Sequence, residues 1–415
     1  MRILWVKAGK LLPVDSGGKI RSYNIVRQLA NEHEVTFLSY YGGKRDPRYE
    51  GEIVQQLPGA HTIYTAAPES TLAQSLDYIL RLTAKAPYAV TKFTHPDVRR
   101  TVGQWLSRKR FDIAISDFLS ASLNFPDVRP IPAVLFQHNF ETLLWQRMAK
   151  EETSPLRRLA YRVEAAKMAN YERRTIGKFD RVIAVSDRDR DQMRAVGPHC
   201  PITVVPTGVD IQQYPIVPSA PGKPPLLVFT GSMDWEPNID AVEYFSKEIW
   251  PEVLNAFPEA RFQVVGRNPH RRIQSLASAC IEVTGTVPSV TTYLRNATVV
   301  VVPLRIGGGT RLKIFEAMAM GKALVSTSIG AEGLDVAHSR DILLADDAAS
   351  FAQAILQLLR DPSRRQAYEQ AAAAQARRYD WSRIAERFAD ALRETITGVR
   401  SSRQVDGSAT LPVSS

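Results

Sequence analysis

The sequence VVVVPLRIGGGTRLKIFEAMAMGKALVSTSIGAEGLD, residues 299–335, joins two apolar runs through a glycine turn and a helix-forming segment. Residues 299–303 are a continuous apolar run, as in a strand of a parallel sheet covered on both faces. Three glycines at 307–309 allow a tight turn, and strong helix formers follow them. Gly321 then ends the helix before the second apolar run. This order of strand, turn, helix and strand predicts an α/β fold with a parallel sheet.

The glycine turn has the features of an anion-binding site. Thr310 can cap the helix that follows, and the free amides and positive dipole end of a helix suit a phosphate. Arg311 and Lys313 add two positive charges there. Glu316 is the only carboxylate in residues 297–329, so one acidic group is set apart for hydroxyls. The alternative is a helix–sheet core without a ligand, although such a core needs neither the three glycines nor the two cations.

This arrangement resembles the donor-nucleotide site of the family 4 retaining glycosyltransferases. In that family a strand ends in Pro, and a loop leads to a helix that carries Glu followed by Ala-Met-Ala-x-Gly. Pro303, Glu316 and Gly321 match this pattern, and residues 330–334 match the next family loop. The chain also departs from the family at one position. Another Glu usually lies eight positions before Glu316 and contacts the donor sugar, whereas this chain has Gly308.

The resemblance implies the B-type fold, an α/β architecture of two Rossmann-like domains facing a cleft, and a nucleotide-sugar donor. Glu316 would hold the ribose hydroxyls, and the amides near Thr310 to Leu312 would hold the diphosphate. His138 would form a hydrogen bond at the reacting centre without acting as a nucleophile. The predicted catalytic residues are therefore His138 and Glu316. The predicted donor-binding residues are Gly17, Gly18, Gly231, Arg267, Gly309, Thr310, Arg311, Leu312, Lys313 and Glu316.

Two of these features lie after predicted strands in the first half of the chain. Gly17 and Gly18 follow the first strand and open a helix, so the backbone there can approach an anion or a sugar. His138 follows a buried strand, and α/β sheets place ligands at the carboxyl ends of their strands. The alternatives are a plain helix entry for the glycines and a capping or core role for the histidine.

Gly208 follows the last predicted strand of the first half, and Gly231 and Gly266 each follow a predicted strand of the second half. Each of these glycines forms either an ordinary turn or a ligand-approaching loop. By resemblance, Gly231 would approach the diphosphate and Arg267 would flank the base. Many family members carry an Arg and a Lys in the loop after the first strand of the second domain. This chain has SMDWEP at 232–237. The cationic role would then pass to the two basic residues at the helix start described above.

Strand and helix patterns alternate through both halves, which predicts two Rossmann-like domains with parallel sheets. The predicted strands are 2–6, 34–40, 113–116, 133–137, 182–185 and 202–205 in the first half, and 226–229, 261–265, 281–284, 298–303, 323–327 and 342–345 in the second. The Pro-rich segment PIVPSAPGKPP cannot continue regular structure. The predicted organisation is an N-terminal domain at 1–214, a linker at 215–225, a donor-nucleotide domain at 226–380, a helix at 381–397 that by resemblance crosses back to the first domain, and a disordered tail at 398–415.

The positive charge is concentrated in the first half. The formal net charge is +10, and residues 1–210 carry +9 of it. Residues 157–181 are strongly basic and form a predicted helix with an apolar stripe. The stripe consists of Leu156, Leu159, Ala160, Val163, Ala166 and Ala169. Such a helix can lie on an anionic membrane surface, or it can be a core helix with a solvated charged back.

Several classes of site and segment are not expected. The chain has two cysteines with no neighbouring His cluster, so neither a disulfide nor a metal site is predicted. No apolar run approaches the roughly 20 residues that cross a bilayer, and the N-terminus does not have the pattern of a signal peptide. The sequence contains no recognised nucleic-acid module, no G-x-G-x-x-G and no P-loop, so nucleic acid is not an expected partner.

The predicted function is transfer of a sugar from a nucleoside-diphosphate donor to an acceptor hydroxyl, with retention at the anomeric carbon and no metal cofactor. By family analogy the acceptor is a glycan or a lipid-linked molecule in exopolysaccharide or surface-glycan synthesis. The expected location is the cytoplasm, with the anionic inner face of the membrane as a candidate surface. The alternatives are a catalytically weak or inactive polysaccharide-assembly protein that binds nucleotide sugar, and a sugar-nucleotide epimerase of the same fold.

Overall fold

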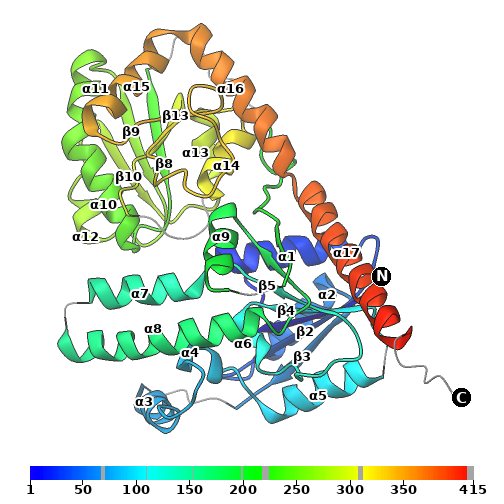
Figure 1. Ribbon diagram of the computed structural model, residues 1–415. Helices are drawn as coiled ribbons and strands as arrows, with labels where there is room; N and C mark the ends of the chain where they lie inside the picture. The colour runs from blue at the N-terminus through cyan, green and yellow to red at the C-terminus, as the bar shows by residue number, and fades with distance from the viewer. Residues whose placement is uncertain are drawn as a thin grey trace, which may run out of the picture. The chain divides into compact units, whose positions relative to one another are not determined.

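The computed structural model describes residues 1–66, 71–108, 110–152, 154–197, 200–216, 224–306 and 312–408 (Figure 1). The chain forms two compact units. The first comprises Met1–Pro206 together with the chain from Ile384 onward, and the second comprises Thr207–Arg383. Each unit is built on a parallel sheet, as the alternating strand and helix patterns predict.

The first unit has a seven-stranded sheet in the order β3-β2-β1-β4-β5-β6-β7. Its strands are β1 (Arg2–Ala8), β2 (Glu34–Tyr41), β3 (Ala60–Tyr64), β4 (Ile113–Asp117), β5 (Ala133–Phe136), β6 (Arg181–Ala184) and β7 (Ile202–Val204). Its helices are α1 (Gly17–Leu29), α2 (Pro47–Gln56), α3 (Thr71–Leu80), α4 (Tyr88–Thr91), α5 (Pro96–Ser107), α6 (Leu119–Ser122), α7 (Glu141–Glu151), α8 (Pro155–Ile176), α9 (Asp187–Ala195) and α17 (Trp381–Ser408). The strand order reverses between β1 and β4, and parallel sheets bind ligands at such switch points.

The last helix packs against the sheet of the first unit. Phe388 of α17 stacks on Trp5 with ring centroids 5.4 Å apart, and it meets the Phe136 ring edge-on at 5.1 Å. Arg181 Nε also donates to Thr395 Oγ1 at 2.8 Å. These contacts join the end of the chain to the first sheet through both apolar and polar side chains.

Helix α17 continues to Ser408, so the prediction of a disordered tail is wrong for residues 398–408. Once a helix is nucleated and packed, each further residue adds a backbone hydrogen bond without a new nucleation cost. The polar composition of these residues therefore does not prevent helix formation. Residues 409–415 of the predicted tail lie outside the described part of the chain.

The second unit has a six-stranded sheet in the order β10-β9-β8-β11-β12-β13. Its strands are β8 (Leu226–Thr230), β9 (Arg261–Val265), β10 (Ile281–Gly285), β11 (Val299–Val302), β12 (Ala323–Ser326) and β13 (Leu343–Leu344). Its helices are α10 (Glu236–Tyr244), α11 (Trp250–Ala256), α12 (Arg271–Gln274), α13 (Thr291–Asn296), α14 (Leu312–Ala319), α15 (Ala348–Arg360) and α16 (Pro362–Ala376), with a π-helical turn at Phe245–Ile249 and a 3-10 turn at Arg377–Tyr379. The two apolar runs that predicted the fold are β11 and β12, and every residue of both is buried.

The boundary between the units falls at Thr207, earlier than the predicted end of the first domain at residue 214. Val209 N donates to Tyr379 O at 2.8 Å, and a Cβ on Gly208 would lie 2.6 Å from the ring of Trp381. This segment therefore packs within the second unit, and its sequence alone does not show these distant partners. Residues 217–223 of the predicted linker lie outside the described residues.

Candidate active site

The strand-order switch of the first unit brings two charged side chains together. Lys7 near the end of β1 pairs in register with Asp117, which ends β4. Lys7 Nζ donates to Asp117 Oδ2 at 3.1 Å and to Ser22 Oγ at 3.2 Å. The side chains of Lys7 and Asp117 are 9% and 0% exposed. This ion pair is therefore buried. It lies at the carboxyl ends of the strands, where α/β folds bind ligands.

Asp117 is the centre of the hydrogen-bond network at this edge. Besides Lys7, Trp5 Nε1 donates to its Oδ2 at 2.9 Å, and His138 Nε2 lies 2.7 Å from its Oδ1. Burial alone would raise the pKa of Asp117, but the Lys7 ammonium and His138 outweigh burial and hold this pKa well below its usual range. Asp117 is therefore an ionised carboxylate at neutral pH.

His138 lies directly after β5, packed between two aromatic rings. Its ring centroid is 4.5 Å from that of Phe136 and 5.4 Å from that of Phe118. Arg21 Nη1 lies 3.2 Å from His138 Nδ1 and donates to the His138 carbonyl at 2.9 Å. Burial lowers the pKa of His138 to about 4, although Asp117 opposes the shift. The imidazole is therefore neutral at neutral pH.

The partners of His138 assign its tautomer. Asp117 is a carboxylate and can only accept, so Nε2 carries the proton and donates to it. Nδ1 then accepts from Arg21. Burial lowers the pKa of Arg21 to about 10, which still leaves the guanidinium protonated at neutral pH. Both ring nitrogens of His138 therefore have protein partners, and Arg21 is the cation beside it.

A buried carboxylate on α8 fixes the chain on either side of His138. Glu172 accepts hydrogen bonds from Gln137 Nε2 at 3.0 Å, Glu141 N at 3.1 Å and Thr142 N at 2.8 Å. Burial raises the pKa of Glu172 to about 7, and these donors oppose the rise. The carboxylate thus caps the start of α7 and holds the β5 end, so both flanks of His138 are fixed.

The turn after β4 adopts an unusual backbone conformation. Phe118 has φ 74° and ψ 169°, a region that costs a residue other than glycine about 1–3 kcal/mol. Phe118 N donates to Phe136 O at 2.8 Å, and Ser116 Oγ donates to Phe118 O at 3.1 Å. These bonds hold the conformation that places the Phe118 ring against His138.

Gly17 and Gly18 form the start of α1, as predicted. A Cβ on Gly18 would lie 3.8 Å from His138 Cδ2, which is an ordinary contact. The predicted glycine turn therefore lies against the predicted histidine. Contacts within the protein do not by themselves require a glycine at position 18.

The loops after β8 and β9 approach each other closely in the second unit. A Cβ on Gly266 would lie 1.6 Å from Gly231 O, so only glycine fits there. A Cβ on Gly231 would lie 2.7 Å from Asn238 Nδ2 and 3.0 Å from Lys313 Nζ. Arg267 Nε donates to Ser232 Oγ at 2.9 Å, which ties the second loop to the first.

Lys313 extends from α14 to the carboxyl end of β8. Its Nζ donates to Asn238 Oδ1 at 2.9 Å and lies 4.1 Å from the centroid of the Phe229 ring. Three of the predicted donor-binding residues, Gly231, Arg267 and Lys313, are thus gathered around one strand end. The structure places a positive charge there although the loop at 232–237 contains no Lys or Arg.

Glu316 lies one helical turn after Lys313 on α14, so the two side chains share a face. Tyr214 Oη donates to Glu316 Oε1 at 3.0 Å. Burial raises the pKa of Glu316, and the Tyr214 hydroxyl and Lys313 oppose this rise. The predicted ribose-binding carboxylate therefore has a tyrosine partner that the sequence did not reveal. Leu312 is the first residue of α14, whereas Gly308, Gly309, Thr310 and Arg311 lie outside the described residues.

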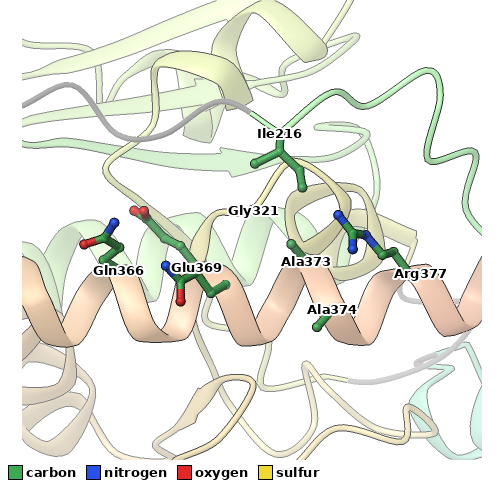
Figure 2. A pocket seen from close by; sticks show the side chains of 8 residues that line it. Ile216, Gly321, Gln366, Glu369, Ala373, Ala374 and Arg377 are labelled. Atoms are coloured by element: carbon green, nitrogen blue, oxygen red, sulfur yellow. The ribbon is translucent and has the colours of Figure 1, made fainter.

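A cavity of about 310 Å³ lies elsewhere in the second unit, between Ile216 and helix α16 (Figure 2). Its lining residues are Ile216, Gly321, Gln366, Glu369, Gln370, Ala373, Ala374 and Arg377. Gly321 follows the end of α14, whereas Lys313 is near its start. None of the lining residues is a predicted site residue, so this cavity is distinct from the cluster at the end of β8.

Several residues at the strand ends of both units were not predicted from the sequence. In the first unit these are Lys7, Arg21 and Asp117, and in the second they are Tyr214 and Asn238. A charged residue near the end of an apolar strand was an available signal for Lys7 and Asp117. Within the described ranges, no three or more His, Cys, Asp or Glu side chains are grouped as metal ligands.

Comparisons with known proteins cover both units. A family model described as Glycosyltransferase Family 4 matches residues 16–213, and one described as Glycosyl transferases group 1 matches residues 224–361. A phosphatidyl-myo-inositol mannosyltransferase from Mycolicibacterium smegmatis is 25% identical over 365 residues, which are 84% of this chain and 89% of the relative.

The solved structures with similar folds match the chain over nearly its full length. Sucrose-phosphate synthase from Thermosynechococcus elongatus superposes with a TM-score of 0.70 at 16% identity, covering 96% of this chain and all of that one. Anabaena Alr3699/HepE in complex with UDP gives 0.66 at 14% identity, covering 95% of this chain and all of that one. Two glycosyltransferase family models match successive parts of the chain, and the two-domain fold matches solved glycosyltransferase structures. The protein therefore belongs to the family 4 glycosyltransferases, also described as group 1, which have the B-type fold.

Proposed function

We propose that this glycosyltransferase moves a sugar from a nucleoside-diphosphate donor to an acceptor hydroxyl, with retention at the anomeric carbon. The observation that carries the proposal is the placement of Lys313 beside Gly231 at the end of β8, with the partly buried Glu316 one turn along the same helix. An ammonium suits a diphosphate, and a carboxylate suits the two hydroxyls of a ribose. The similar Anabaena protein was solved with UDP, which agrees with a nucleotide donor.

In the proposed reaction the bond between the anomeric carbon and the diphosphate oxygen breaks, and a bond to the acceptor oxygen forms. The proton of the acceptor hydroxyl passes to an oxygen of the departing diphosphate. Lys313 stabilises the negative charge that develops on that diphosphate, so no metal cofactor is required in this scheme. Asp117 is fully buried and accepts from Lys7, Trp5 and His138, so we assign it no role as a nucleophile.

The proposal extends to an acceptor that is a glycan or is linked to lipid, used at an anionic membrane surface. The outer face of α8 supports this extension. Leu156, Leu159 and Val163 are 82%, 61% and 40% exposed, and their spacing places them on one helix face. The buried positions of α8 include Glu164, Ala165, Met168 and Glu172. The interpretation of the predicted apolar stripe as a core face is therefore wrong for its three large residues, which face outward.

Helix α3 and the turn after it add apolar side chains to the same unit. Leu76, Ile79, Leu80 and Leu82 are 47–79% exposed. Lys167 Nζ donates to Leu82 O at 2.7 Å, which joins this segment to α8. We call these four residues, together with Leu156, Leu159 and Val163, the α3–α8 surface.

The charge beside the α3–α8 surface favours an anionic partner. Arg157 and Arg162 are exposed on α8, and the described residues place no carboxylate within 4.0 Å of either. A second copy of this chain would bring two such basic surfaces together, which is unfavourable. Apolar side chains flanked by Arg suit the interface of an anionic bilayer. No helix in the described ranges has the length and hydropathy of a membrane span.

The donor proposal is tested by thermal unfolding of the purified protein with UDP, GDP and ADP and their sugars, with and without EDTA. A donor that binds only the folded protein at about 100 times its dissociation constant stabilises it by about 2.7 kcal/mol. Selective stabilisation that persists in EDTA, followed by turnover of the corresponding sugar nucleotide, is expected. Binding without turnover would favour the alternative of an inactive assembly protein, and no stabilisation by any nucleotide would overturn the donor site.

The membrane extension is tested by co-sedimentation with vesicles of phosphatidylglycerol and of phosphatidylcholine. We expect binding to the anionic vesicles, weakened by Leu156→Ser/Leu159→Ser and by added salt. Val128→Ser is the matched control, because Val128 is 89% exposed but lies outside the α3–α8 surface. Equal loss in the control variant, or equal binding to neutral vesicles, would contradict the extension. Concentration-dependent self-association through this surface would assign it to a second copy instead.

A further inference from the structure

We propose that Asn238 is the positioning residue that fixes the ammonium of Lys313 at the diphosphate site. The inference rests on the proposed donor function and assigns a role to a residue that neither the sequence analysis nor the comparisons identified. Asn238 lies in the first turn of α10 and is 3% exposed. Its side chain reaches the end of β8, where the loops containing Gly231 and Gly266 meet.

The carboxamide of Asn238 uses both of its polar atoms. Its Nδ2 donates to Ser232 O at 2.8 Å, which holds the loop after β8. Its Oδ1 accepts from Lys313 Nζ at 2.9 Å. One side chain therefore links the loop from the first strand of the second sheet to the cation on α14. Breaking this link removes one hydrogen bond from the loop and one from the ammonium.

The chemistry of an amide suits this role better than that of a carboxylate. An Asn oxygen is neutral, so it orients the ammonium without cancelling its charge. A carboxylate at the same position would form an ion pair with Lys313 and reduce the charge that a phosphate meets. The Phe229 ring, 4.1 Å from Nζ, supports the ammonium from another side and also leaves its charge intact.

The surrounding glycines show that this arrangement is closely fitted. A Cβ on Gly231 would come within 3.0 Å of both Asn238 Nδ2 and Lys313 Nζ. The polar ends of Asn238 and Lys313 therefore lie directly against the backbone at Gly231. A phosphate that approaches this backbone would meet an ammonium held in place before binding. Such pre-orientation lowers the entropic cost of binding.

The inference is tested with Asn238→Asp and Asn238→Ala, and calorimetry measures the affinity of each variant for UDP, GDP and ADP and for the corresponding nucleosides. Asn238→Asp should weaken binding of the nucleoside diphosphate about tenfold, as expected for a hydrogen-bonded charged group. Affinity for the nucleoside should not change, because it has no phosphate. A merely structural role would instead reduce both affinities. Asn255→Asp on α11 makes the same charge change at an exposed position and should not affect either affinity.

A double-mutant cycle with Lys313→Gln distinguishes a failure of the Asn238 inference from a failure of the proposed donor site. If Asn238 acts through Lys313, the variant that carries both Asn238→Ala and Lys313→Gln should bind no more weakly than Lys313→Gln alone. Additive losses would overturn the positioning role. If Lys313→Gln itself leaves nucleoside-diphosphate affinity unchanged, the proposed donor site fails. If only the Asn238 variants bind like the wild type, the donor site stands and this inference alone is rejected.

Discussion

At the strand ends of the first unit Lys7 and Asp117 form a buried ion pair, whereas at the strand ends of the second unit the described partners of Lys313 and Glu316 include an amide and a phenol. In the first unit Lys7 and Arg21 surround the pair formed by Asp117 and His138. In the second unit Lys313 is bound to an amide and Glu316 to a phenol. The first arrangement pairs buried charges with one another, whereas the second lies at the proposed donor site. The two regions should therefore respond differently to mutation.

The largest effect is expected from Asp117→Ala. The change leaves the Lys7 ammonium buried without its carboxylate, and breaking a buried ion pair in this way costs about 3–5 kcal/mol. Native-state hydrogen exchange of the β1 and β4 amides measures the loss within the first unit. The double variant Lys7→Met/Asp117→Leu removes both charges and should lose less stability than Asp117→Ala. A larger loss in the double variant would show that charge burial is not the cause.

A pH dependence should separate the two regions further. The pKa of His138 is about 4 in the folded protein and about 6.5 in an unfolded chain. At His138 the unfolded state therefore binds more protons between these values, so the His138 contribution to the free energy of unfolding falls as the pH drops from about 6.5 to 4. The full shift corresponds to about 3 kcal/mol. The lowered pKa of Asp117 adds a further loss only below about pH 4. Glu172, whose pKa burial raises to about 7, contributes in the opposite direction between about pH 7 and 4.5.

Urea unfolding of the wild type and of His138→Gln between pH 4 and 7 checks this dependence. Glutamine does not titrate, so the stability of the variant should fall less on acidification than that of the wild type. Equal slopes in the two proteins would mean that His138 is not the titrating group.

In the second unit we expect an effect on affinity rather than on stability. Glu316→Gln should raise the dissociation constant of the nucleoside diphosphate about tenfold, because a charged acceptor for the ribose is lost. Tyr214→Phe keeps the ring and removes one hydrogen bond to Glu316, so a smaller increase is expected. A 2′-deoxynucleotide should lose less affinity on Glu316→Gln than the ribonucleotide does. An equal loss for both sugars would remove the proposed contact with the 2′-hydroxyl.

The comparison between units also shows what the sequence could and could not predict. Local patterns were sufficient for the apolar strands, for the helix start at Gly17 and for the position of His138 just after its strand. The partners of these residues were not predictable in the same way. Asp117 lies 110 residues from Lys7, and Asn238 lies 75 residues from Lys313. Such residues are brought together only by the order in which the parallel strands pair. No local sequence periodicity indicates that order.

Three further features show the same limit. Strand β3 at Ala60–Tyr64 lies at the edge of its sheet and is only partly buried, so its residues have no strong apolar pattern. Tyr214 precedes a Pro-rich segment and has no sequence feature that links it to Glu316. The conformation of Phe118 at positive φ is equally hidden, since nothing in IAISDFLS marks a residue that needs glycine-like freedom.

The smallest effects are expected from replacing single glycines by alanine. Gly18 in the first unit and Gly231 in the second allow the two units to be compared in this way. Gly18→Ala places a methyl group in ordinary contact with His138, and alanine is favoured over glycine in a helix by about 0.5–1 kcal/mol. The variant should therefore be as stable as the wild type or slightly more stable. Gly231→Ala should instead destabilise the second unit, because its Cβ would collide with Asn238.

Turnover distinguishes the two roles that remain open for Gly18. If the α1 start approaches the donor through its backbone, Gly18→Ala should reduce sugar transfer while stability is kept, since the new methyl group would occupy space that the donor needs. Measuring both thermal stability and transfer rate on the same preparation makes this separation. Unchanged transfer would reduce Gly18 to a helix entry packed on His138.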